Sequence, residues 1–136
     1  MKYKNNPANI RSGSRWLGLS GTRNGFCEFQ SLEYGLRALL IILYKYYYKY
    51  NLRSISSIIH RFAPPSENDT TSYILYVEKF VKNEMSFDDR YPFLIYVAVA
   101  ICYYESHTSI DIKYLSQVCY KYFKRFSTYY EKENSD

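Results

Sequence analysis

The sequence predicts a mainly α-helical fold of about five helices with a small β-element near the N-terminus. From residue 31 onward, apolar residues recur at spacings of three and four, as a helix with one buried face requires. All five glycines fall within the first 35 residues, which concentrates turns there. Residues 93–104, FLIYVAVAICYY, are apolar on every side and are expected to form a helix at the centre of the core.

The first strand and the first helix are expected to form one unit. Residues 26–29 alternate between inward and outward positions like a strand. Ser31 is placed to cap the following helix, and Glu33 lies in its first turn, where the helix dipole favours a negative charge. Arg37, one turn later, is the expected ion-pair partner of Glu33. This helix is expected to end near Asn51.

Caps and prolines mark the later helices. Ser54 can cap a short second helix, which Pro64-Pro65 stops because proline donates no backbone hydrogen bond. Residues 68–69 offer a cap for a third helix, and Pro92 fits the first turn of a fourth. A fifth helix is expected over residues 108–130.

The length of 136 residues fits a single domain over residues 1–136. We expect a glycine-rich loop and β-segment over residues 1–30, a helical body over 31–130 and a frayed polar tail over 131–136. No apolar run approaches the roughly 20 residues of a transmembrane segment. No signal-peptide pattern is found, so we expect synthesis in the bacterial cytoplasm without a signal peptide.

The composition is tyrosine-rich and basic, with 18 tyrosines and a net charge of +5. This charge slightly favours anionic partners such as an acidic wall polymer or nucleic acid. Lysine and arginine interleave with tyrosine over residues 44–50 and 121–125, but helix faces explain this pattern more simply than nucleic-acid binding does. The three cysteines are far apart and are expected to be buried, so no metal and no cofactor are predicted.

Four phrases follow one another along the chain: NNPANIR over residues 5–11, WLG over 16–18, GFCEFQSLEYGLRA over 25–38 and RFAPPSENDT over 61–70. Together they resemble a phage-associated family usually described as structural or virion proteins, over roughly residues 5–105. Phe62 stands where that family usually has tryptophan. The resemblance implies a bacteriophage protein that is virion-associated and has other virion proteins as partners. An oligomer is compatible with this interpretation.

Glu105 is the carboxylate best placed for chemistry. It directly follows the apolar helix, where desolvation and the negative end of the helix dipole are expected to raise its pKa. A carboxylic acid that stays protonated is what general-acid cleavage of a glycosidic bond requires. The alternative is that Glu105 is only the solvated end of a core helix.

An apolar helix that ends in Glu and a small polar residue resembles the catalytic helix of lysozyme-like muramidases and lytic transglycosylases. In those enzymes the helix precedes the loop and β-region, so the likeness implies a lysozyme-like fold in permuted order. The sequence of motifs is also similar to that of bacterial glucosaminidases downstream of their catalytic helix. These likenesses imply peptidoglycan glycan strands as the substrate.

Glu67 is the second catalytic candidate, with a capping role for the third helix as its alternative. Arg11 and Arg61 could each bind phosphate or carboxylate groups, and Arg11 is favoured because it lies in the NPxNIR phrase. Trp16 is either a sugar platform or a hydrophobic plug. The predicted substrate-binding residues carry amide, charged or aromatic groups: Asn6, Asn9, Arg11, Trp16, Glu33, Arg37 and Asn68.

Three functions follow from these observations. The first is a phage-type, virion-associated module that binds and cleaves peptidoglycan as a glycoside hydrolase or lytic transglycosylase. The second is a non-enzymatic virion structural or assembly protein, and the third is a nucleic-acid-binding protein.

Overall fold

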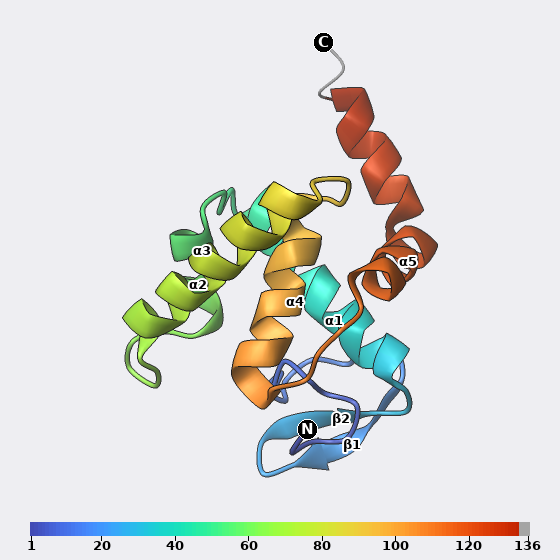
Figure 1. Cartoon of the computed structure of the whole chain (residues 1–136). Coiled ribbons are helices and arrows are strands. Elements are labelled where there is room, and N and C mark those ends of the chain that lie inside the picture. The colour runs from blue at the N-terminus through green and yellow to red at the C-terminus, as the bar shows by residue number, and fades with distance from the viewer. Residues whose placement is uncertain (134–136) are drawn as a thin grey trace.

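The computed structural model describes the backbone of residues 1–133 and the side chains of residues 1–123. Within this part of the chain, a two-stranded hairpin precedes five α-helices and one π-helical turn (Figure 1). The elements are β1 (Leu19–Arg23), β2 (Phe26–Phe29), α1 (Leu32–Tyr44), η1 (Lys45–Lys49), α2 (Ile55–Phe62), α3 (Thr70–Phe87), α4 (Phe93–Ser106) and α5 (Ile112–Glu133). The prediction of a mainly α-helical fold with a small β-element is confirmed.

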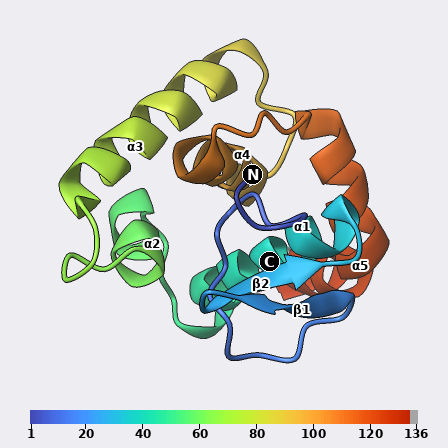
Figure 2. The same cartoon turned by 90° about the horizontal axis from the view of Figure 1, so that it is seen from below.

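Helix α4 lies at the centre of the helical body. Every residue from Leu94 to Cys102 is buried, as the all-round apolar sequence predicts. The helix packs against α1, α3 and α5, which surround it in Figure 2. His107 ends α4 with a left-handed backbone, at φ 53°.

The helix boundaries follow the polar residues next to them. Ser31 and Ser54 accept hydrogen bonds from the first turns of α1 and α2, and Asp69 does the same for α3. The last helix begins at Ile112, later than predicted, because Asp111 accepts a hydrogen bond from the backbone N–H of Tyr114 and caps it.

Helix α5 bends at Phe123, where φ is −121° and ψ is 18°. The part after this bend points away from the helical body in Figure 1. The helix continues to Glu133, whereas the sequence predicts a polar tail from residue 131. The end of that tail, residues 134–136, lies outside the described part of the chain.

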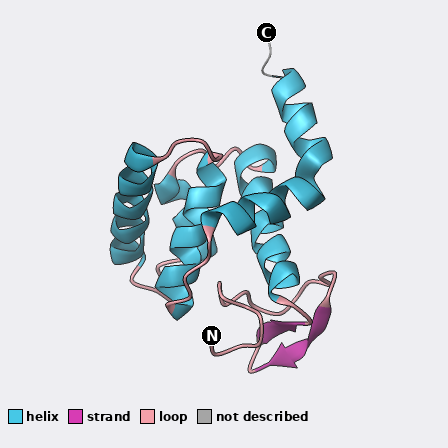
Figure 3. Ribbon diagram, turned by 45° about the vertical axis from the view of Figure 1, so that its right-hand side comes forward, coloured by secondary structure: helices cyan, strands magenta, loops and turns pink. Residues whose placement is uncertain are grey.

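The antiparallel hairpin lies at one end of the helical body (Figure 3). The segment before it is fixed by the buried side chain of Asn6, which donates to the carbonyl groups of Ile10 and Cys27 at 3.0 and 2.8 Å. The Asn6 side chain also accepts from the backbone N–H of Ile10 at 2.9 Å. One side chain therefore ties the NNPANIR phrase to β2.

Gly35 is required where the N-terminal segment crosses α1. A Cβ atom at this position would lie 1.9 Å from the backbone oxygen of Asn5. We expect Gly35→Ala to lower the free energy of unfolding by about 1–3 kcal/mol because the two backbones must separate. Gly21→Ala is the control, since a Cβ atom at Gly21 would have no other atom within 4 Å. Urea denaturation measures both variants, and equal stability of the two would contradict this packing.

Candidate functional site

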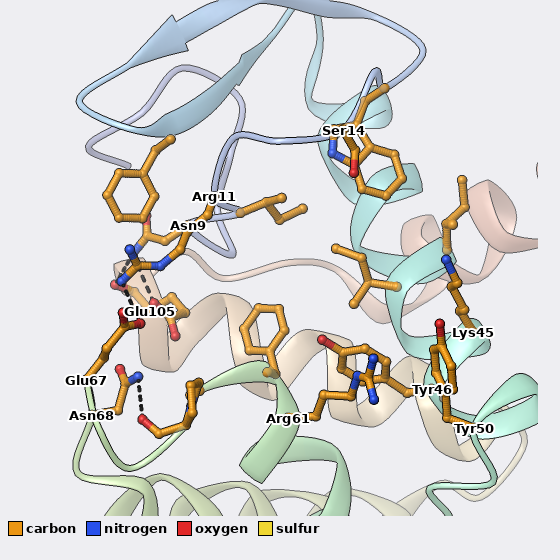
Figure 4. A pocket seen from close by; sticks show the side chains of 18 of the residues that line it. Asn9, Arg11, Ser14, Lys45, Tyr46, Tyr50, Arg61, Glu67, Asn68 and Glu105 are labelled. Carbon is orange, nitrogen blue, oxygen red and sulfur yellow. Dashed lines mark hydrogen bonds and ion pairs between the residues drawn. The ribbon is translucent and has the colours of Figure 1, made fainter.

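A cavity of about 800 Å³ opens between the N-terminal segment, α1 with η1, and the α2–α3 loop (Figure 4). This volume falls within the roughly 300–1,000 Å³ range of ligand pockets. Six of the predicted site residues line it: Asn9, Arg11, Trp16, Glu67, Asn68 and Glu105. They come from three regions that are remote in sequence, so the fold brings them together.

Glu105 lies at the C-terminal end of α4 and is partly buried. The side-chain amide of Asn9 donates to the Glu105 carboxylate at 3.1 Å and to the Glu105 backbone carbonyl at 3.2 Å. Asn9 adopts a left-handed backbone conformation, at φ 53°, which asparagine tolerates better than most residues. Ser106 fixes the same junction by donating to the Pro7 carbonyl at 2.7 Å. The NPxN phrase thus docks directly on the end of the core helix.

Burial raises the pKa of Glu105, and this effect outweighs the opposing influence of Tyr73, Asn9 and Arg11. The Tyr73 hydroxyl is buried beside the carboxyl group without a hydrogen-bond partner among the described residues, and it interacts with Glu105 electrostatically. The ring of Tyr73 stacks on Tyr104 with centroids 3.8 Å apart. Glu105 therefore has the environment of a carboxyl group that holds its proton longer than an exposed one.

This burial predicts a pH-dependent effect of Glu105→Gln on stability. As the pH rises above 4.5, the carboxyl group ionises first in the unfolded chain, because its pKa is raised in the folded protein. The wild-type protein therefore loses stability as the pH rises from 4.5 through the pKa of the Glu105 carboxyl group in the folded protein. The variant loses none over this interval, because glutamine does not titrate. We expect the variant to gain stability relative to the wild type over this interval. Urea denaturation between about pH 3.5 and 7.5 measures the difference in the free energy of unfolding between the variant and the wild type. A difference that stays constant with pH, or that changes in the opposite direction, would contradict the burial of Glu105.

Glu67 lies on the α2–α3 loop, where its carboxylate pairs with Arg11 at 3.1 Å. The side chains of Glu67 and Arg11 are 49% and 63% exposed, so this pair adds little stability. The helix-capping role considered for Glu67 belongs to Asp69 instead, which accepts from the backbone N–H of Ser72. Glu67 is thus oriented at the pocket, next to Glu105 and Arg11 in Figure 4.

Trp16 and Asn68 have structural contacts as well as positions in the pocket wall. The Trp16 ring is half-buried and packs against the core, and its Nε1 group is buried without a hydrogen-bond partner among the described residues. The side-chain amide of Asn68 donates to the Pro64 carbonyl at 3.2 Å and so stabilises the loop that carries Glu67.

Three predicted residues, Asn6, Glu33 and Arg37, do not line the pocket. The Asn6 side chain is fully buried and bonded to backbone groups, as described above. Glu33 pairs with Lys121 at 3.0 Å and accepts from the Tyr122 hydroxyl at 2.5 Å, instead of pairing with Arg37 as expected. The Arg37 guanidinium lies over the ring of Tyr122, with its Cζ 5.3 Å from the centroid. Glu33 and Arg37 therefore connect α1 to α5.

Sequence reasoning missed Tyr73 and the far side of the pocket, where Lys45, Tyr46 and Tyr50 lie with Arg61 in Figure 4. Periodicity assigns Tyr73 to a buried helix face, and it does not reveal the carboxyl group next to it. The interleaved lysines and tyrosines of residues 44–50 indicate only an amphipathic face. The sequence favours Arg11 over Arg61 for anion binding, although both line the pocket.

Among the described residues, no cluster of three or more histidine, cysteine, aspartate or glutamate side chains could hold a metal ion. None of the described helices combines the length and the apolarity that crossing a bilayer requires.

No protein-family model matches the chain. The chain is similar to Protein P5 of Pseudoalteromonas phage PM2, with 41% identity over 103 residues. The matched region spans 67% of this chain and 62% of Protein P5, so less than two thirds of that relative is covered. This similarity supports a relationship between the chain and a phage protein.

Proposed function

We propose that this protein is a phage module that binds peptidoglycan glycan strands and cleaves them, with Glu105 as the general acid. The observation that carries the proposal is geometric: a partly buried carboxyl group, held by the side-chain amide of Asn9, lies at the wall of a ligand-sized cavity. Its burial, which raises its pKa, supports the same role. In this mechanism Glu105 protonates the glycosidic oxygen as the bond to the anomeric carbon breaks. Asn9 orients the carboxyl group through its hydrogen bond.

Glu67 is the proposed second carboxylate. In a hydrolase it would either activate a water molecule or attack the anomeric carbon, depending on its separation from Glu105 in the complex. Arg11 orients it through the ion pair. If Glu105 acts alone, the C6 hydroxyl of the sugar can attack the anomeric carbon instead and give its proton to the Glu105 carboxylate that remains after the first proton transfer. The product then carries an anhydro ring rather than a new reducing end.

The test is incubation of the purified protein with peptidoglycan sacculi, followed by mass spectrometry of the released muropeptides. The proposal predicts fragments with new glycan ends, and the type of end separates hydrolysis from intramolecular cleavage. Release of no fragment by the wild-type protein would remove the enzymatic proposal.

A non-enzymatic role in the phage particle is the second candidate function. The similarity to a phage protein favours it. Co-purification with virions, by a protein that leaves glycan strands intact, would support this role over the first. Nucleic-acid binding has less support, since Tyr44 is buried and Tyr46, Tyr47 and Tyr48 are half-buried.

A further inference from the structure

The two sides of the pocket differ in charge. Among residues 1–123, six charged residues line it, four cationic (Arg11, Arg15, Lys45 and Arg61) and two acidic (Glu67 and Glu105). Arg11 is paired with Glu67. No carboxylate among residues 1–123 forms an ion pair with any of the other three cations. Two of these cations, Lys45 and Arg61, lie on the side of the pocket away from Glu105 in Figure 4. That side therefore carries positive charge that no carboxylate of the described residues neutralises.

Arg61 is held by aromatic rings on this side. Its guanidinium carbon lies 4.1 Å from the ring centroid of Tyr50 and 5.4 Å from that of Tyr46. Burial raises the pKa of Tyr46, and the nearby Arg61 partly offsets this effect. Stacking holds a guanidinium by its planar face and leaves N–H groups at its edge for an anion. Lys45, one residue before Tyr46, adds a second charge to the same wall.

We infer that Lys45 and Arg61, with the hydroxyl groups of Tyr46 and Tyr50, form a subsite for a carboxylate carried by the glycan. This inference rests on the proposed function, because it names which glycans the pocket prefers. Peptidoglycan carries such a group on each muramic acid, either as the free lactyl carboxylate or as a carboxylate of the attached peptide stem. A neutral glycan would leave these cations without a partner.

Binding measurements test the subsite without depending on cleavage. Glu105→Gln is used as the background for every protein, so the ligands stay intact. The ligands are glycan strands freed of their peptides by an amidase, muropeptides with intact stems, and neutral chitin oligosaccharides. We expect the anionic ligands to bind about tenfold more tightly than the neutral one, with an affinity that falls as salt rises. If the peptide-free strands bind more tightly than the muropeptides, the group that occupies the subsite is the lactyl carboxylate. If the muropeptides bind more tightly, it is a carboxylate of the peptide stem.

Arg61→Gln is expected to lower the affinity for the anionic ligand about tenfold. The affinity for chitin oligosaccharides should change by no more than about twofold. Arg61→Lys should recover part of the loss, because it keeps the charge without the planar fork. Arg53→Gln is the matched control: the Arg53 guanidinium lies 4.2 Å from the ring centroid of Tyr47, but the residue does not line the pocket. This variant should bind like the background protein.

Equal losses for Arg61→Gln and Arg53→Gln, or equal losses for anionic and neutral ligands, would overturn the inference. Its failure is distinguishable from failure of the proposed function. A wild-type protein that cleaves glycan strands without discriminating between the ligands removes only the subsite. A protein that discriminates between them but does not cleave removes only the enzymatic activity.

Discussion

Replacing Glu105 with glutamine is expected to lower the rate of glycan cleavage by about 10²–10⁴-fold, the usual contribution of a general acid. Glutamine keeps the shape of the side chain but has no proton to give to the leaving oxygen. The fold should persist, because the substitution also removes a partly buried ionisable group. Time courses of muropeptide release at saturating glycan measure the effect on the chemical step.

Glu78→Gln is the matched control for this experiment. Glu78 is an exposed residue of α3 that does not line the pocket, so its replacement makes the same chemical change elsewhere. Its cleavage rate should equal that of the wild type. Equal rates for Glu105→Gln and Glu78→Gln would show that Glu105 is not the acid, even if the wild type cleaves peptidoglycan.

The largest expected loss of stability comes from Asn6→Ala. This change removes three hydrogen bonds of a fully buried side chain and leaves the carbonyl groups of Ile10 and Cys27 without that donor. We expect the free energy of unfolding to fall by about 3–5 kcal/mol, since a buried unsatisfied polar group costs about 1–3 kcal/mol. Urea denaturation measures this loss.

Asn83→Ala is the control for Asn6→Ala, because the side chain of Asn83 is exposed on α3 and its removal should change stability by no more than about 0.5 kcal/mol. Asn6→Asp separates shape from hydrogen bonding, since a carboxylate would face the two carbonyl oxygens without a proton to donate. If Asn6→Ala weakened glycan binding while leaving stability unchanged, Asn6 would be a ligand residue, as the sequence predicts, and not a structural one.

The helices could be predicted because their determinants are local. Apolar spacing, the caps at Ser31, Ser54 and Asp69, and the uniform apolarity of α4 all act within a few residues. Apolar alternation does not predict strand β1, because its sequence, LSGTR, has only one apolar residue. The Asn24-Gly25 pair before β2 is a strong hairpin signal and could have located it.

The candidate site was only partly predictable because it depends on long-range contacts. The position of Glu105 at the end of an apolar helix indicated a shifted pKa, and the direction of that shift agrees with its burial. The amide that orients it belongs to Asn9, 96 residues earlier, and no local pattern links the two. Glu33 shows how a local pattern can predict the wrong partner. Its position one helical turn before Arg37 predicts an ion pair between these two residues, but its carboxylate pairs with Lys121, 88 residues later.

The central claim is that Glu105 is a proton-donating acid at a glycan-binding cavity, and NMR titration of its side-chain carboxyl carbon tests this most directly. The spectra are recorded for the wild-type protein with and without short glycan strands, and the signal is assigned with Glu105→Gln. We expect a pKa above the ordinary value of 4.5 and a change in the signal when glycan is added. A pKa at or below that value, with a signal that glycan leaves unchanged, would contradict the claim.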